Sequence, residues 1–261
     1  MPVAGSYPVG QALYLVVMGP AGSGKSTLSS AFGRWIEEQQ GFSVAYVNLD
    51  PGAEQTPYAP DVDVRKYVRV RDVMRERGLG PNGALIVSME LLYRRREEIM
   101  VEVDNLDADF VIVDTPGQME LFVFHETGPA FSREFAKRGA ACALMLFDAS
   151  LAARPSELVT LKLMGLVAQL RLDLPTVVAL NKSDLEQSRA VSRWLEDPRA
   201  LVEDLSRERG VVSELAAQMA ALLDEYSVAS RIPMISALRG EGLDELYDLI
   251  HEVWCTCGDL T

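Results

Sequence analysis

Cysteine is scarce in this chain, which has three of them among 261 residues. A sparse, odd-numbered set argues against a disulfide framework and is typical of a reducing compartment. Histidine is scarcer still, because His125 and His251 are the only two. Neither has a serine or cysteine partner in a recognisable hydrolase context, so we expect no histidine-based nucleophilic catalysis.

Long apolar runs and an excess of positive charge are also missing. No stretch reaches the ~18 apolar residues that a membrane span needs, and the N-terminus lacks the basic flank of a signal peptide. Lys and Arg total 25 against 38 Asp and Glu, which gives a formal net charge of −13. Nucleic acids and anionic membranes repel such a chain. We therefore expect a cytoplasmic protein that binds neither nucleic acid nor membranes.

What the chain does contain is a series of short apolar strands that alternate with helical segments. Strands are predicted at Leu13–Met18, Val44–Leu49, Phe110–Val113, Ala141–Phe147, Thr176–Leu180 and Ile232–Ile235. Helices are predicted at Thr27–Gln40, Ser156–Leu170, Gly242–Trp254 and over most of Glu196–Ala229. The alternation predicts an α/β fold: a mostly parallel sheet flanked by helices on both faces, in three layers.

The segment 61–105 between the second and third predicted strands is mostly helical. Gly80-Pro81-Asn82-Gly83 breaks it into two helices, because this composition favours a tight turn. We expect residues 1–261 to form a single domain with residues 61–105 as a helical insertion.

A phosphate-binding loop follows the first predicted strand. Residues 19–26 match the pattern G-x-x-x-x-G-K-[ST] between a strand and a helix, which is the context that this motif requires. Its backbone N–H groups would point at phosphate oxygens, Lys25 would reach the β- and γ-phosphates, and the Ser26 hydroxyl would bind Mg²⁺. The expected nucleotide contacts here are Gly22, Ser23, Gly24, Lys25, Ser26 and Thr27.

A second polar cluster, residues 114–118 (DTPGQ), closes the third predicted strand. Asp114 alone could be a turn-capping residue, but beside a phosphate loop it can hold Mg²⁺ through water. The Gly117 N–H can contact a γ-phosphate, and Gln118 can orient water. We therefore expect this cluster to act at the metal and the γ-phosphate of the nucleotide bound by the phosphate loop.

The sequence Asn181-Lys182-Ser183-Asp184 follows the fifth predicted strand and resembles the guanine-reading N-K-x-D motif of GTPases. The Asp184 carboxylate can accept from the guanine N1–H and exocyclic amine, whereas adenine would leave it unpaired. Asn181 would contact the base edge or tie loops together, and the Lys182 stem can lie along the ring. Downstream, Ser236-Ala237-Leu238 resembles the segment that contacts the guanine carbonyl through backbone N–H groups.

Taken in order, these motifs resemble the GPN-loop GTPases, a family of the SIMIBI class of phosphate-loop proteins. The resemblance runs from about Leu13 to Trp254 and includes Asn48-Leu49-Asp50-Pro51 and the tripeptide at 80–82. It implies Mg²⁺-dependent hydrolysis of GTP to GDP. Asp50 would position the attacking water or a Mg²⁺-bound water, although Asp50-Pro51-Gly52 by itself is also a good turn.

The resemblance further implies a homodimer that forms through the nucleotide face and the GPN loop. Asn82 would reach the partner's nucleotide near the γ-phosphate, and Gly80 and Pro81 would shape the loop. The dimer would be a GTP/GDP switch, and a protein client in RNA polymerase assembly is implied by eukaryotic relatives. No arginine finger is evident, since nothing in the sequence directs Arg65 or Arg69 at phosphate.

Two other functions stay open at this point. A phosphate-loop kinase would use the same loop to transfer phosphate to an acceptor, but the N-K-x-D motif and the segment 236–238 argue against it because such kinases usually bind adenine. A slowly hydrolysing scaffold or assembly factor is compatible with every motif above.

Overall fold

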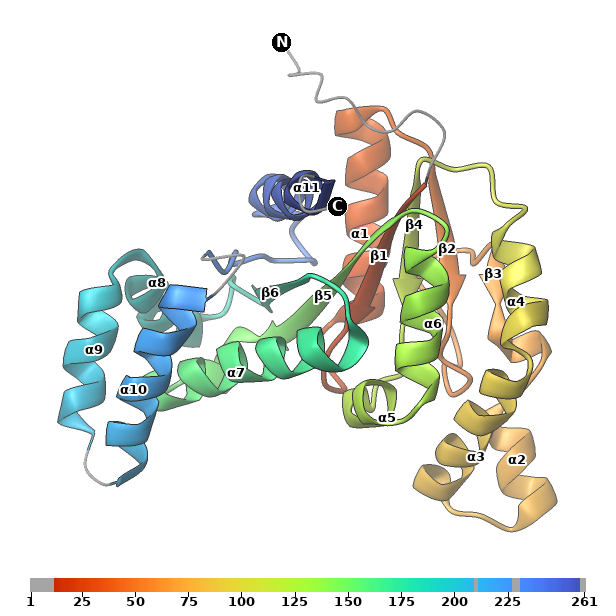
Figure 1. Cartoon of the computed structure of the whole chain (residues 1–261), viewed down its shortest axis with the longest axis horizontal. Helices are drawn as coiled ribbons and strands as arrows, with labels where there is room; N and C mark the ends of the chain where they lie inside the picture. The colour runs from red at the N-terminus through yellow and green to blue at the C-terminus, as the bar shows by residue number, and fades with distance from the viewer. Residues whose placement is uncertain (1–11, 209–210, 227–230, 259–261) are drawn as a thin grey trace.

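The computed structural model describes residues 12–208, 211–226 and 231–258, and its centre is a six-stranded sheet in the order β3-β2-β4-β1-β5-β6 (Figure 1). From one edge to the other the strands are Val62–Asp63 (β3), Val44–Asn48 (β2), Phe110–Asp114 (β4), Leu13–Met18 (β1), Ala140–Asp148 (β5) and Thr176–Asn181 (β6). All of these neighbours pair in parallel. The predicted α/β class with a parallel sheet is confirmed.

Helices cover both faces of the sheet because β1 and its neighbours are apolar on both sides. Leu13, Leu15 and Val17 pack into a core with the helices Lys25–Trp35 (α1) and Leu243–Gly258 (α11). Alternate side chains of β1, such as Val16, belong to a second core with Thr127–Ala136 (α6) and Pro155–Leu172 (α7). A continuous apolar strand is typical of such double burial.

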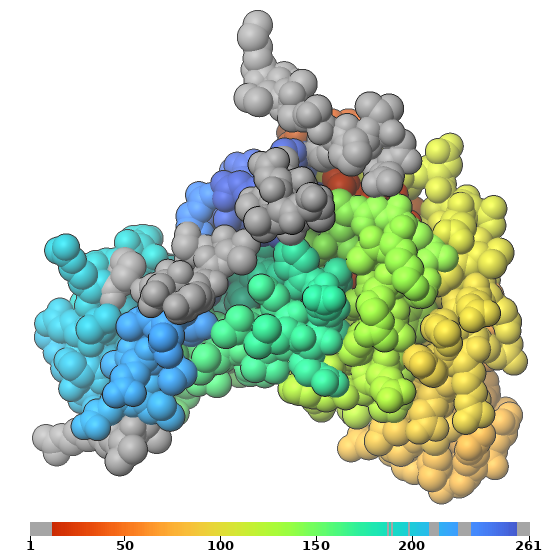
Figure 2. All heavy atoms as spheres, viewed as in Figure 1, coloured from red at the N-terminus to blue at the C-terminus, as the bar shows by residue number. Residues whose placement is uncertain are grey.

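Two groups of helices lie at opposite ends of the molecule. Beyond β6 lie Arg189–Glu196 (α8), Pro198–Arg207 (α9) and Val211–Tyr226 (α10), coloured cyan to blue in Figures 1 and 2. On the side of β3, at the other edge, lie Val70–Arg77 (α2), Pro81–Arg94 (α3) and Arg96–Val103 (α4), coloured orange to yellow. The short helix Met119–Phe124 (α5) lies between them, next to α6 and α7. The sequence patterns did not assign α5 and α6.

A break inside 61–105 is present, but it lies just before the predicted turn, because residues 81–83 form the first turn of α3, and the helix predicted after it is divided at Arg95 into α3 and α4. Helix α2 ends at Arg77 and is followed by Gly78, whose φ of 63° satisfies a left-handed C-terminal cap. Helix α3 then begins at Pro81, with Gly80 as its N-cap, and proline is favoured at this first helical position because it has no N–H to satisfy.

The start of this segment and the last predicted strand are corrected by the structure. Val62 and Asp63 form a short edge strand beside Val47 and Asn48, so the helical region begins later than predicted. A two-residue strand has no detectable period, which is why the pattern missed it. The predicted strand at 232–235 makes only an isolated bridge between Leu180 and Met234. The sixth strand of the sheet is therefore β3, at the opposite edge.

Candidate functional site

The phosphate-binding loop connects β1 to α1 at the carboxyl edge of the sheet. Gly22 and Gly24 have φ values of 79° and 94°, in the left-handed region that favours glycine. A Cβ on Gly24 would lie 2.4 Å from the Asn181 Nδ2, so this position needs glycine for close approach as well as for its backbone angles. The sequence thus builds a tight turn pressed against the end of β6.

Lys25 is buried at the start of α1, and its ammonium is directed back over the loop. Its Nζ donates to the carbonyls of Gly19, at 3.0 Å, and Pro20, at 3.2 Å. Burial lowers the pKa of Lys25, and the charges of Asp114 and Asp50 oppose that shift. The loop therefore holds a positive charge whose neutral carbonyl partners a phosphate oxygen could replace.

Asp114 closes β4 beside the loop and is 3 % exposed. Its Oδ2 accepts a hydrogen bond from the Tyr58 hydroxyl at 2.9 Å, while its Oδ1 is buried without a hydrogen-bond partner. Burial raises the pKa of Asp114, and the Ser26 hydroxyl, the Tyr58 hydroxyl and the Lys25 charge lower it. An unpaired buried oxygen of this kind calls for a partner such as a metal-bound water.

These residues fit the predicted magnesium site. Mg²⁺ prefers oxygen ligands and takes one or two from protein, with phosphate and water supplying the rest. The Ser26 hydroxyl and the Asp114 carboxylate provide such oxygens in one place. Among the described residues there is no cluster of three His, Cys, Asp or Glu side chains that could hold a metal ion.

Asp50 lies at the start of the loop after β2 and faces the same centre. Its Oδ1 accepts from the Gly52 N–H at 2.7 Å. Burial raises the pKa of Asp50, whereas hydrogen bonds from the backbone N–H groups of Gly52 and Gly117 and the charge of Lys25 lower it. The structure therefore brings together three residues that were predicted from separate motifs: Asp50, Gly117 and Lys25.

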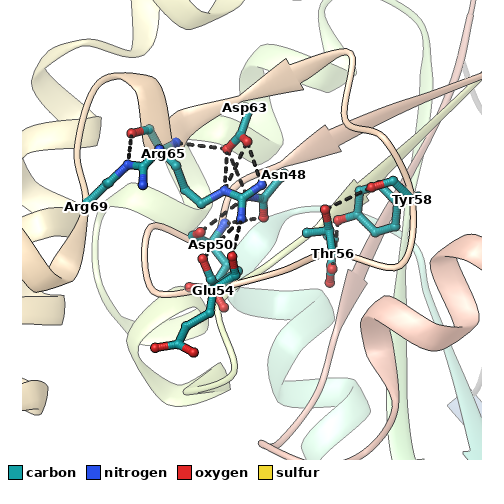
Figure 3. A network of polar contacts seen from close by, with 10 residues as sticks. Asn48, Asp50, Glu54, Thr56, Tyr58, Asp63, Arg65 and Arg69 are labelled. Atoms are coloured by element: carbon teal, nitrogen blue, oxygen red, sulfur yellow. Dashed lines mark hydrogen bonds and ion pairs between the residues drawn. The ribbon is translucent and has the colours of Figure 1, made fainter.

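Asn48 holds the backbone of Asp50 in place (Figure 3). The Asn48 Oδ1 accepts from the Asp50 N–H at 3.0 Å, and its Nδ2 donates to the Asp63 Oδ1 at 3.0 Å. Asp63 in turn pairs with Arg65, whose Nη2 lies 2.7 Å from the Asp63 Oδ2. This network ties the start of the loop after β2 to the segment that follows β3.

The Arg65 guanidinium makes further hydrogen bonds within the same network. Its Nη1 donates to the carbonyls of Ala53 and Glu54, both at 3.2 Å. Arg69 lies farther out, with its Nε donating to the Arg65 carbonyl at 3.2 Å (Figure 3). The guanidinium of Arg65 therefore braces the loop that carries Asp50 rather than extending as a free finger.

The GPN loop meets the second polar cluster within the same chain. Asn82 is exposed in the first turn of α3, and its Oδ1 accepts a hydrogen bond from the Gln118 Nε2 at 2.9 Å. Gln118 is half-buried at the N-cap of α5. The reach of Asn82 toward a partner's nucleotide stays a prediction, but the position of Gln118 beside it is a feature of the single chain.

Asn181 joins the phosphate loop to the loop that precedes α11. It is 3 % exposed; its Nδ2 donates to the Ser23 carbonyl at 2.8 Å and its Oδ1 accepts from the Ala237 N–H at 3.0 Å. Of the two roles that the sequence left open, contact with the base edge or tying loops, the structure displays the second. The Ala237 N–H that we expected to contact guanine is bonded to Asn181, and Leu238 is 82 % exposed.

Asp184 and Lys182 are each fixed by a neighbour. The Ser236 hydroxyl donates to the Asp184 Oδ1 at 2.7 Å, and this bond holds the pKa of Asp184 below its ordinary value. Lys182 has a left-handed backbone with φ of 67°, and its Nζ lies 2.6 Å from the Asp148 Oδ2. A carboxylate and a lysine, each held by a neighbouring side chain, therefore lie just after the end of β6.

Sequence reasoning missed several residues that shape the site: Asn48 as a brace for Asp50, Tyr58 beside Asp114, Arg65 with Asp63, and Asp148 beside Lys182. Asp148 could have been suspected, because it ends a buried strand at the carboxyl edge of the sheet. Tyr58 carries no such signal, since it lies in a loop of irregular sequence.

Known proteins resemble this chain over most of its length. A family model described as "conserved hypothetical ATP binding protein" matches residues 17–256. A GPN-loop GTPase of Pyrococcus abyssi is 36% identical over 254 residues, covering 95% of this chain and 100% of that protein. GPN-loop GTPase 3 of Dictyostelium discoideum is 32% identical over 226 residues, covering 84% of this chain and 79% of that protein.

The likeness extends to three dimensions. The crystal structure of the Pyrococcus abyssi GTPase in its apo form superposes with a TM-score of 0.85 at 35% sequence identity, covering 94% of this chain and 98% of that chain.

In the part of the chain that the structure describes, no helix is both long enough and apolar enough to cross a membrane.

Proposed function

The chain belongs to the GPN-loop GTPase family and is a GTPase; we propose that it hydrolyses GTP to GDP and phosphate in a Mg²⁺-dependent reaction and that this reaction switches a homodimer between two states. The observation that carries the proposal is the position of Asn181. Through its bonds to Ser23 and Ala237, it holds the phosphate loop and the segment 236–238, to which we assign contact with guanine, against each other.

The roles of the phosphate-side residues follow from their chemistry. Lys25 and the N–H groups of residues 22–27 would bind the phosphates, and Ser26 with Asp114 would hold Mg²⁺, which neutralises charge on the transferring phosphoryl group when bound. Asp50 accepts protons or hydrogen bonds and is the residue best suited to orient the attacking water. Gln118 is the second candidate for that task.

Guanine is the base that the polar groups at the end of β6 support. The ionised Asp184 matches the two donors of guanine, and the stem of Lys182 can cover the ring. Adenine would leave the carboxylate without a donor, which costs binding free energy. This reasoning favours guanine although the matching family model is described as ATP binding.

We propose that Asn82 acts at the nucleotide of the partner subunit. The amide offers hydrogen bonds to the transferring phosphoryl without adding charge. Its exposure and its place at the tip between α2 and α3 support contact with a second chain. Residues 61–105, as part of one domain with the rest of 1–261, would then transmit the state of the nucleotide to the dimer. A protein client in polymerase assembly and a cytoplasmic location are further proposals taken from the family resemblance and the sequence.

Phosphate release from GTP and from ATP, each with Mg²⁺ or with EDTA, tests this proposal. We expect turnover only when GTP and Mg²⁺ are both present, and by light scattering we expect the mass of a dimer with GDP as well as with a non-hydrolysable GTP analogue. Equal turnover in EDTA would contradict the metal requirement. Phosphate transfer that needs an added acceptor would instead favour the kinase alternative, whereas phosphate release that is very slow with purified protein would favour the scaffold.

A further inference from the structure

Tyr58 lies in the loop between β2 and β3, and this loop is anchored at several points. The Tyr58 ring stacks on the Tyr46 ring of β2, with centroids 4.8 Å apart and planes 18° apart. The Ser30 hydroxyl of α1 donates to the Pro57 carbonyl at 3.0 Å. The Thr56 hydroxyl donates to the Tyr58 carbonyl at 2.9 Å (Figure 3). These contacts fix the ring and so leave its hydroxyl little freedom.

The hydroxyl reaches the residue that we assign to the metal. It donates to the Asp114 Oδ2 at 2.9 Å, and the Asp114 Oδ1 remains buried without a hydrogen-bond partner. A carboxylate can rotate about its terminal bond and exchange its two oxygens. Because one oxygen is held by Tyr58, the other is the oxygen available to the phosphate loop.

The chemistry of the two groups sets the direction of this bond, because the phenol hydroxyl donates and the carboxylate oxygen accepts. A hydroxyl that donates to a buried carboxylate stabilises the ionised form of that carboxylate, which is the form that a divalent cation requires.

We propose that Tyr58 is a positioning residue of the metal centre: its hydroxyl orients Asp114 so that Oδ1 points to the metal-bound water. This inference rests on the proposed Mg²⁺ dependence. Two residues of the loop that follows β2 would then act at this centre. Asp50 would orient the attacking water, and Tyr58 would orient the metal-binding carboxylate. Partners that orient metal-binding side chains in this way typically contribute strongly to metal affinity.

Mn²⁺ binding to the GDP complex tests the role of Tyr58, with the free ion counted by electron paramagnetic resonance. Tyr58→Phe removes the hydroxyl and keeps the ring on Tyr46, and we expect it to weaken Mn²⁺ binding about 10-fold or more. GDP affinity in EDTA should stay unchanged. Tyr46→Phe is the matched control, because it removes a hydroxyl from the same stack without touching Asp114, and it should bind Mn²⁺ like the wild type.

The outcomes separate this inference from the proposed function. If the wild-type complex binds Mn²⁺ and the Tyr58→Phe variant binds it with equal affinity, the role of Tyr58 is overturned and the metal assignment stands. A Tyr58→Phe variant that loses GDP affinity in EDTA as strongly as it loses Mn²⁺ affinity would also overturn it, because Tyr58 would then merely hold the loop. A wild-type complex that binds no Mn²⁺ would refute the metal assignment and this inference with it.

Discussion

The side chains of Gln118 and Asn82 are hydrogen-bonded within one chain, with the Gln118 Nε2 donating to the Asn82 Oδ1 over 2.9 Å. This bond joins the GPN loop at the start of α3 to the residue that caps α5. Two amides that the sequence assigns to the same reaction therefore lie together before any second subunit is considered. Because this bond uses only the Asn82 Oδ1, it does not occupy the Nδ2 donors with which Asn82 could reach a partner's phosphate.

Replacement of Asn82 by alanine removes its amide and is expected to slow hydrolysis. We expect turnover to fall about 100-fold, the usual cost of losing one donor to a developing charge, while GDP affinity stays the same. Single-turnover phosphate release and GDP titration measure the two quantities. Asn105→Ala removes an amide from another exposed asparagine, and it should leave both unchanged. Normal turnover of Asn82→Ala would contradict a role in the reaction.

Mixed dimers decide whether Asn82 acts across the interface. One subunit carries Asn82→Ala and keeps its nucleotide site, and the other carries Lys25→Ala and keeps its GPN loop. If Asn82 acts on the partner's nucleotide, the purified mixed dimer should recover about half of the wild-type activity, since one of its two sites is complete. If Asn82 acts on its own chain's nucleotide, the mixed dimer should be as inactive as either parent.

The ion pair between Asp63 and Arg65 predicts a pH-dependent stability. Burial raises the pKa of Asp63, but the hydrogen bonds from Arg65 and Asn48 outweigh it and leave this pKa below its ordinary value. At pH values above about 4, the ordinary pKa of an aspartate in the unfolded chain, the ionised Asp63 stabilises the fold. This stabilisation is lost as the pH falls through the lower pKa that Asp63 has in the folded state. Asp63→Asn should therefore be less stable than the wild type at neutral pH by about 1–3 kcal/mol.

Thermal unfolding between about pH 7 and pH 3 measures this difference. The gap in melting temperature between wild type and Asp63→Asn should narrow toward the acidic end. Asp107→Asn, which removes an exposed carboxylate, is the control and should show no such gap. A gap that stays constant down to the lowest pH would show that the charge of Asp63 does not stabilise the loop.

The parallel sheet and the phosphate loop were predictable because their signals are local. An apolar run such as 13–18 can only be buried on both faces, and the glycines and Lys25 of the loop follow it at fixed spacing. Gly80 and Pro81 similarly marked the start of α3, since their backbone preferences act within a few residues.

Some features of the site could not be predicted from the sequence because they depend on contacts between residues that lie far apart in the chain. Tyr58 and Asp114 are 56 positions apart, and their contact depends on how the loop after β2 packs on α1. The edge strand β3 forms because Val62 meets Val47 in the sheet, and its two residues carry no pattern of their own. Asn181 showed the chemistry of a base-contacting residue, but its bonds to Ser23 and Ala237 emerged only from the fold.

Calorimetric titration of GDP, ADP and XDP into the wild type and Asp184→Asn tests most directly whether this site selects guanine through Asp184. The wild type should bind GDP and should not bind ADP. Asp184→Asn should prefer XDP, since the extra carbonyl of xanthine accepts where guanine donates. Binding of ADP as tight as that of GDP, or a guanine preference that survives in Asp184→Asn, would show that Asp184 does not select the base.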